Sequence, residues 1–137
     1  MSSHRNSRAA ARPGSKGRVL VVDDEPAIRD GLVMLLTWEG YAVVTAESGE
    51  AAVEQAAAEP FDVAITDLRM PGMAGDETVA ALKRIDPNLP VIVVTGYASD
   101  EVAVRCSEQG AFRVVGKPVQ IEDLLRLVEA ALSDPHT

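Results

Sequence analysis

Cysteine, aromatic residues and long hydrophobic runs are all scarce in this 137-residue sequence. The one cysteine, Cys106, excludes an intramolecular disulfide framework and favours a reducing, cytoplasmic location. Aromatic residues make up only 4% of the chain, so the core must be built from Val, Leu, Ile and Ala. The strongest hydrophobic stretch, residues 91–94, is far shorter than the ~18 residues that span a membrane. We therefore expect one soluble domain with an aliphatic core.

Charge is distributed unevenly along the chain. The net charge is −8, yet residues 1–18 contain five cations and no acid, so the remainder is strongly acidic. Residues 1–17 are rich in Arg, Ser, Gly and Ala without periodicity, which predicts a disordered basic N-terminal tail. An organelle transit peptide or a nucleic-acid arm are the alternatives for this tail, although an acidic body repels phosphate backbones. The folded domain is predicted over residues 18–133, with a frayed C-terminus at 134–137.

Short β-branched runs alternate with segments of helical length from Arg18 onward. The runs predict five strands, at residues 18–22, 41–46, 61–66, 91–95 and 112–116. The segments between and after them predict five helices, at about 26–39, 48–59, 75–85, 99–109 and 121–132. This alternation indicates an α/β fold with right-handed crossovers, a parallel sheet and helices on both faces.

The helical segments carry apolar stripes at helical spacing. In the first of them Ile28, Leu32 and Leu36 repeat on one face, and Trp38 near its end is expected to contribute to packing. Ser48 is the expected N-cap of the second helix. Cys106 is interpreted as a small buried hydrophobe without a lowered pKa.

Polar residues follow four of the predicted strands where those strands end. They are Asp23-Asp24-Glu25, Asp67, Thr95 and Lys117. Ligands of parallel α/β sheets bind at the carboxyl ends of the strands, so these side chains are expected to converge. Helix capping explains any one of them, but it is a weak explanation for all four.

The chemistry of this cluster indicates a divalent cation. Asp23, Asp24 and Asp67 bring three negative charges together against one positive charge from Lys117, and a cation relieves their repulsion. Oxygen ligands without nearby His or Cys favour Mg²⁺, with Mn²⁺ as a possible substitute, over zinc. A carboxylate beside Mg²⁺ and Lys is suited to attack phosphorus, so the cluster predicts a site that accepts a phosphoryl group on Asp.

The order of these motifs resembles the receiver domain of bacterial two-component response regulators. The motifs are VLVVDDEP at residues 19–26, DLRMPGMAG at 67–75, VIVVTG at 91–96, Gly110-Ala111, and Gly-Lys-Pro ending at Pro118. Each fragment is weak alone, but their order and spacing span most of the chain. The resemblance implies the flavodoxin-like doubly wound fold with strand order 2-1-3-4-5.

The resemblance also implies residue roles. Asp67 corresponds to the phosphoacceptor, Asp24 to a direct Mg²⁺ ligand and Asp23 to a ligand acting through water. The backbone carbonyl of Arg69 completes the protein ligands. Lys117 contacts the phosphoryl oxygens and precedes a cis bond to Pro118, while Thr95 moves its hydroxyl onto the phosphoryl group. The implied readout face is formed by the predicted elements at 99–109, 112–116 and 121–132.

Several residues bear on the tuning of the switch. Receiver domains usually place an aromatic residue three positions before the Lys, whereas this chain has Val114, which cannot swing between buried and exposed aromatic poses as the usual coupling to Thr requires. Tyr97 or Phe112 are possible substitutes, although packing is the simpler interpretation of Phe112. Arg69 is a candidate for controlling the lifetime of the phosphoryl group, because its guanidinium is expected at the rim of the site.

The expected function is a phosphorylation-activated signalling receiver and not a turnover enzyme. Its expected partners are a sensor histidine kinase or phosphotransfer protein, and then a protein target or a second copy of the chain, with no direct nucleic-acid or membrane contact. A degenerate, phosphate-independent receiver remains an alternative. A phosphatase with an Asp nucleophile is a less fitting alternative. That class needs an acid two residues after the nucleophile, and in this chain Arg69 stands at that position after Asp67.

Overall fold

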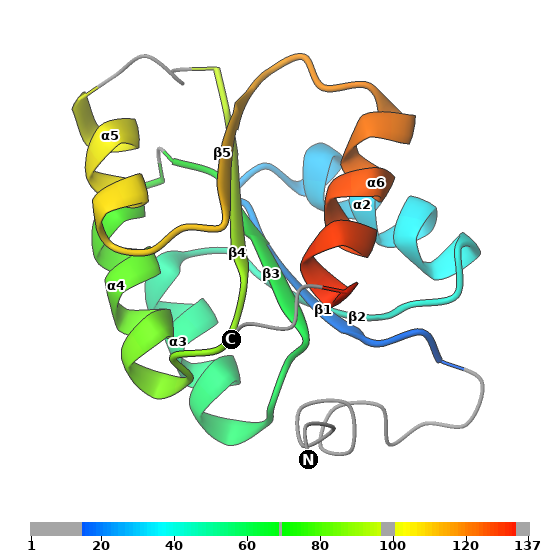
Figure 1. Cartoon of the computed structure of the whole chain (residues 1–137), viewed down its shortest axis with the longest axis horizontal. Helices are drawn as coiled ribbons and strands as arrows, with labels where there is room; N and C mark the ends of the chain where they lie inside the picture. Colours follow the sequence, from blue (N-terminus) through cyan, green and yellow to red (C-terminus); the bar gives the residue numbers. More distant parts are fainter. Residues whose placement is uncertain (1–14, 69, 97–100, 134–137) are drawn as a thin grey trace.

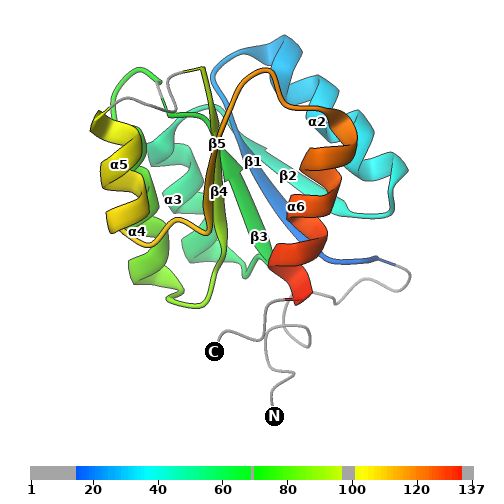
Figure 2. The same cartoon turned by 45° about the horizontal axis from the view of Figure 1, so that its top comes forward.

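Five parallel strands form one sheet that lies between two layers of helices (Figures 1 and 2). The structure is a computed structural model, and it describes residues 15–68, 70–96 and 101–133. The strand order is β2-β1-β3-β4-β5, which confirms the doubly wound topology that the resemblance implies. Most of the predicted tail and the predicted frayed end lie outside the described residues. Residues 15–17 lead into the sheet, where the Lys16 N–H donates to the Gly40 carbonyl at 2.9 Å.

Strands and helices alternate along the chain as predicted. In chain order they are β1 (Arg18–Val22), α2 (Pro26–Trp38), β2 (Ala42–Ala46), α3 (Gly49–Ala58), β3 (Val63–Thr66), α4 (Gly75–Ile85), β4 (Val91–Thr95), α5 (Glu101–Glu108), β5 (Arg113–Gly116) and α6 (Ile121–Ser133). No helix within the described ranges is both long and apolar enough to cross a membrane.

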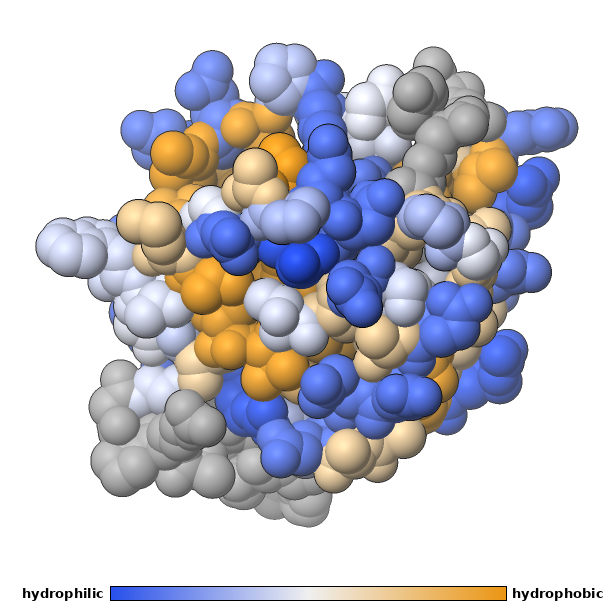
Figure 3. Space-filling view, turned by 180° about the vertical axis from the view of Figure 1, so that it is seen from behind, coloured by the Kyte–Doolittle hydropathy of each residue, from blue (hydrophilic) through white to orange (hydrophobic). Residues whose placement is uncertain are grey.

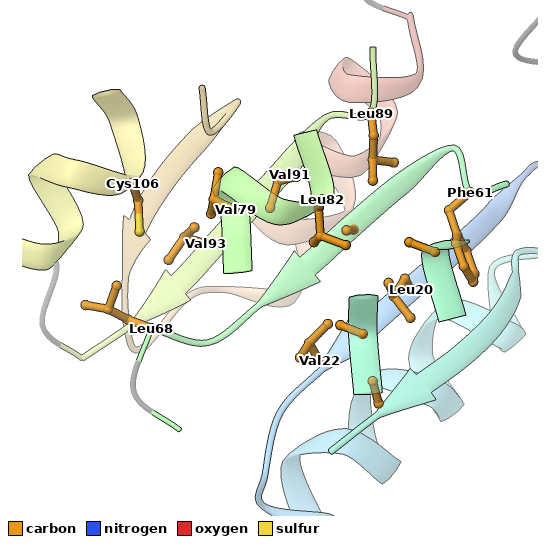
Figure 4. Close-up of a cluster of buried hydrophobic side chains, with 14 of the residues drawn as sticks. Leu20, Val22, Phe61, Leu68, Val79, Leu82, Leu89, Val91, Val93 and Cys106 are labelled. Carbon is orange, nitrogen blue, oxygen red and sulfur yellow. The ribbon is translucent and has the colours of Figure 1, made fainter. Parts of the chain in front are cut away.

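The two faces of the sheet pack against different helices. Successive side chains of a strand point to opposite faces, so in β1 Leu20 and Val22 join one cluster and Val19 and Val21 the other. The first core cluster, shown in Figure 4, joins the sheet to α3, α4 and α5 through residues that include Ala52, Val79, Leu82 and Cys106. The second core cluster joins the sheet to α2 and α6 through residues that include Leu36, Leu124 and Val128. Burial on both faces explains why the strands read as continuous apolar runs.

Three strands begin later than the sequence predicts. Tyr41, Phe61 and Phe112 lie just before β2, β3 and β5. They belong to the same hydrophobic runs as these strands, but the residue-to-residue pairing with the neighbouring strand begins only after them. The N–H of Tyr41 donates to the Leu36 carbonyl at the end of α2 and not to a neighbouring strand. These aromatic side chains contribute burial to the core, so hydrophobicity alone overestimates the strand lengths.

The expected packing of Trp38 is wrong, because this residue is 87% exposed. Helix α2 packs on the sheet through Leu32 and Leu36. Two residues further along a helix is a rotation of about 200°, so Trp38 points away from the face that Leu36 buries.

Viewed from behind, the molecule shows hydrophobic residues interspersed among hydrophilic ones over its surface (Figure 3).

Helices α3 and α4 approach closely at a glycine. A Cβ built on Gly49 would overlap the Thr78 hydroxyl and lie 3.0 Å from the Cβ of Met73. Gly49 and Thr78 are both buried, so neither side can relax into solvent. This contact fixes the start of α3 against the segment that leads into α4.

We predict that Gly49→Ala lowers the free energy of unfolding by about 1–3 kcal/mol, the usual effect of overpacking. The matched control is Gly31→Ala in α2, because a Cβ there meets nothing within 4 Å. That change should raise the free energy of unfolding by up to about 1 kcal/mol, since Ala is the better helix former. Urea unfolding followed by circular dichroism measures both, and a Gly49→Ala protein as stable as the control would contradict the tight contact.

Candidate functional site

The polar residues that follow the strands lie at one edge of the sheet. Hydrogen bonds continue past the strand ends, from the Asp23 N–H to Ala46 O at 3.1 Å and from the Asp67 N–H to Val22 O at 3.1 Å. Each aspartate is therefore the first residue beyond its strand and is still attached to the neighbouring one. Parallel register then places both at the same end of β1 and β3.

Three carboxylates meet at this edge. One oxygen from each of Asp23, Asp24 and Asp67 lies within 4.8 Å of the other two. Asp23 is only 3% exposed, and its Oδ1 accepts a hydrogen bond from the Glu25 N–H at 2.9 Å. The Leu68 N–H donates to Asp67 Oδ1 at 2.6 Å, which fixes one oxygen of that carboxylate. The predicted convergence of the acids is confirmed.

Lys117 brings a positive charge to the cluster from the end of β5. Its Nζ lies 3.4 Å from Asp67 Oδ2, so the two Asp67 oxygens have different partners. The Lys117 N–H also donates to the Thr95 carbonyl at 2.7 Å, which ties the ends of β4 and β5 together. The bond between Lys117 and Pro118 is cis, as the resemblance implies.

Burial raises the pKa of Asp23 above its ordinary value of 3.8. Loss of solvent around the carboxylate is the largest cause, and the negative charges of Asp67 and Asp24 add to it. The hydrogen bond from Glu25 and the charge of Lys117 act in the opposite direction but do not cancel the shift. Ionised Asp23 is thus held in the fold against an electrostatic penalty.

An open cavity of about 530 Å³ adjoins the carboxylates on the α2 and α6 side. Its apolar lining includes Ile28 and Leu32 of α2 and Leu124 of α6, and Asp23 and Asp67 also line it. Aliphatic walls next to charged groups lower the local dielectric, so electrostatic interactions at this edge are stronger than in water.

The cluster of three carboxylates fits a small divalent cation. Oxygens that share an octahedral Mg²⁺ are about 3 Å apart when adjacent and about 4 Å apart when opposite. The 4.8 Å spread is only slightly wider, so a small side-chain rotation, or a water in place of one direct contact, closes the difference. All three ligand atoms are carboxylate oxygens, which are the hard donors that Mg²⁺ takes.

The remaining predicted site residues fall into two groups. Thr95 is fully buried at the end of β4, and Val114 of β5 is partly buried, paired in register with Val93 and packed against the first core cluster. Arg69 and Tyr97 lie outside the described residues, so their predicted roles stay predictions.

One residue at the site has no counterpart in the sequence-based predictions. The Arg29 guanidinium, in the first turns of α2, donates from Nη1 to the backbone carbonyl of Asp23 at 2.8 Å. This bond holds the turn between β1 and α2 that carries Asp23 and Asp24. No local sequence pattern around a single arginine near the start of a helix predicts such a contact.

Cys106 is not part of the site. It is fully buried in the first core cluster, and burial raises the pKa of its thiol to about 11, with the charge of Asp76 adding to the shift. The interpretation of Cys106 as a structural hydrophobe without a lowered pKa is confirmed.

We predict that Asp23→Asn stabilises the metal-free protein near neutral pH. Because the fold raises the pKa of Asp23, the contribution of its carboxyl to stability is fully present below the ordinary value of 3.8 and is lost as pH rises through the folded pKa. Removing the charge should raise the free energy of unfolding by on the order of 1 kcal/mol, or roughly 4 °C in Tm.

Thermal unfolding in a chelating buffer measures the effect of this substitution. The gain should shrink as the pH falls through the folded pKa toward 3.8, and it should reverse in saturating Mg²⁺ because the variant binds the ion less well. Asp30→Asn on the exposed side of α2 is the matched control. A metal-free Asp23→Asn protein that is less stable than wild type near neutral pH would contradict the electrostatic penalty.

Comparisons with known proteins show which family the chain resembles. The family model of the response regulator receiver domain matches residues 19–129. The transcriptional regulatory protein GlrR of Escherichia coli is 40% identical over 114 residues, which are 83% of this chain and 26% of that protein. A cyclic di-GMP phosphodiesterase of Thermotoga maritima is 42% identical over 80% of this chain and 29% of its own length. The chain spans about a quarter of the length of these curated relatives.

Solved structures show the same fold. A CheY-like receiver domain protein of Methanospirillum hungatei superposes with a TM-score of 0.83 at 35% identity, covering 86% of this chain and 94% of that one. The beryllofluoride-activated NtrC4 receiver domain dimer gives a TM-score of 0.80 at 34% identity, covering 87% and 98%. With the family model matching most of its length, the chain belongs to the receiver domain family of two-component response regulators.

Proposed function

We propose that this chain is a phosphorylation-driven receiver in which Asp67 accepts a phosphoryl group from the phosphohistidine of a sensor kinase or phosphotransfer protein. The observation that carries the proposal is the position of Asp67, whose carboxylate lies among two further carboxylates and 3.4 Å from Lys117 Nζ. The receiver domain corresponds to residues 18–133. As in its family, the domain acts as a signalling phosphoacceptor and not as a turnover enzyme.

Transfer requires one new bond and one broken bond. An Asp67 oxygen attacks phosphorus, the bond from phosphorus to the donor imidazole nitrogen breaks, and its electron pair stays on that nitrogen, which takes up a proton from solvent. Asp24 and Asp67 would hold Mg²⁺ directly and Asp23 would hold it through water, and the bound ion would neutralise charge on the transferring oxygens. The backbone carbonyl of Arg69 is the remaining proposed protein ligand.

Two protein groups orient and stabilise the reacting carboxylate. The Leu68 N–H holds Asp67 Oδ1 at 2.6 Å, which leaves Oδ2 on the side of Lys117. As the phosphoryl group arrives, the Lys117 ammonium is placed to pair with its oxygens, because such charge-assisted bonds are strongest where charge develops. The aliphatic walls of the adjoining cavity strengthen these interactions.

The modified site is read on the face that contains α5, β5 and α6. Thr95 stands at the end of β4 with Lys117 bonded to its carbonyl, so a rearrangement at the phosphoryl group reaches β5 directly. Helix α5 has only Ala103 and Cys106 buried within the sheet-facing core, which suits an element that moves at low free-energy cost. Val114, on the neighbouring strand, takes the place of the aromatic side chain usual in the family.

The proposed downstream partner is a protein target or a second copy of the chain. One structural relative is a beryllofluoride-activated receiver dimer, which supports the second possibility for this chain. Direct contact with nucleic acid is not proposed, because the sequence after Arg18 is strongly acidic and repels phosphates. The single free cysteine suits the reducing cytoplasm, where the donor kinase domain would be met.

We predict that incubation with acetyl phosphate and Mg²⁺ adds one phosphoryl group, and that Asp67→Asn abolishes the adduct because an amide oxygen is a poor nucleophile. Intact-mass spectrometry measures it, with and without chelator, and Asp30→Asn on the surface of α2 is the control that should keep the adduct. Absence of an adduct, together with failure to bind beryllofluoride, would support the phosphate-independent alternative.

We predict that Val114→Tyr changes partner binding but leaves phosphorylation intact. The partly buried Val114 packs against the first core cluster, and a tyrosine there projects toward α5, without touching the acids at the strand ends. The expected result is a severalfold change in the affinity of the activated chain for its target or for itself, with the extent of acetyl phosphate labelling unchanged. Equal affinity in the variant and the wild type would remove Val114 as a determinant of the switch.

A further inference from the structure

The segment that follows Asp67 is closed on itself before α4 begins. The Gly75 N–H donates to the Leu68 carbonyl at 3.1 Å, so the chain leaves the sheet at Leu68 and returns to the same point at Gly75. A Cβ on Gly75 would lie 2.7 Å from that carbonyl oxygen, which shows how closely the two ends of the loop approach each other. The N–H of Leu68 in turn holds Asp67 Oδ1. Leu68 therefore links the closed loop to the Asp67 carboxylate, because its carbonyl bonds to Gly75 and its N–H bonds to Asp67.

A carboxylate of α3 contacts this loop from outside. Ser48 caps α3 by accepting the Ala51 N–H, which places Glu50 in the first turn. Glu50 Oε2 accepts a hydrogen bond from the Met73 N–H at 3.1 Å, across 23 positions of sequence. The neighbouring Gly72 has a φ of +85°, and a Cβ built there would lie 2.9 Å from the same oxygen. A glycine is therefore needed at this position both for its conformation and for the approach of Glu50.

We infer that Glu50 is a positioning residue for the metal site, acting through the loop that follows Asp67. The path is a series of described contacts: Glu50 holds Met73, the loop closes from Gly75 onto Leu68, and Leu68 orients the Asp67 carboxylate. Losing the first contact loosens the loop and widens the range of orientations of Asp67. The inference rests on the proposed function, because it requires Asp67 to be a Mg²⁺ ligand.

The position of Glu50 favours this role over a purely helix-stabilising one. An acid in the first turn of a helix is favoured by the helix dipole wherever its side chain points. Here the carboxylate is directed onto the Met73 N–H, and the tight contact of Gly49 with Thr78 holds the start of α3 against α4. The helix start is thus a fixed support for the loop.

The experiment is a calorimetric titration of Mg²⁺ into the 137-residue wild-type chain and four variants, of which Asp67→Asn tests the proposed function itself. Glu50→Ala removes the acceptor and should raise the Kd for Mg²⁺ about fivefold, as expected for loss of one ordinary hydrogen bond. Glu50→Gln removes the charge but keeps an oxygen acceptor, so its Kd should stay within about twofold of wild type. Glu54→Ala, an exposed acid one turn further along α3, controls for loss of negative charge and should also stay within about twofold.

The outcomes separate the inference from the proposed function. Wild-type affinity in Glu50→Ala would overturn the inference, as would a Glu50→Gln variant as weak as Glu50→Ala, because the charge and not the hydrogen bond would then act. A Tm of metal-free Glu50→Ala within a few degrees of wild type, combined with the weaker Mg²⁺ binding, supports positioning and not general destabilisation. If wild type itself binds no Mg²⁺, or Asp67→Asn binds it equally well, the proposed function fails and the inference falls with it.

Discussion

Repulsion among Asp23, Asp24 and Asp67 is the constraint on which this structure depends. The parallel sheet brings the ends of β1 and β3 to one edge, and backbone hydrogen bonds beyond each strand hold Asp23 and Asp67 there. In the unfolded chain Asp67 is 43 positions away from Asp24, so its repulsion with Asp23 and Asp24 arises only in the fold. A cation that relieves it stabilises the folded state and no other. Ligand binding and folding stability are therefore coupled through the same three side chains.

The sheet separates two supports for this cluster. On the α2 and α6 side lies the open cavity, whose aliphatic walls lower the local dielectric and so strengthen electrostatic interactions, and Arg29 holds the turn between β1 and α2. On the other side α3 and α4 pack tightly, and the Glu50 contact ties down the loop after Asp67. Both sides thus hold the geometry of the charges, and the α2 and α6 side also sets their dielectric surroundings.

The sequence predicts the fold and the site to different depths. Alternation of β-branched runs with helical stripes locates all five strands and helices, because periodicity and burial are local consequences of the chain. The convergence of Asp23, Asp67 and Lys117 is predictable since parallel strands end at one edge.

Contacts that depend on tertiary placement are not predictable in this way. Arg29 and Glu50 reach backbone groups that local patterns do not associate with them. Trp38 is misjudged because its size suggests burial, whereas its angular position on α2 determines that it is exposed.

The exposure of Trp38 determines what fluorescence can report about this molecule. It is the sole tryptophan, and its indole already meets water in the folded chain, so unfolding changes its surroundings little. Tryptophan emission is then a poor probe of denaturation, and backbone dichroism is the better one. Conversely, a blue shift of that emission, or protection from an aqueous quencher such as iodide, would report a molecule covering the outer surface of α2.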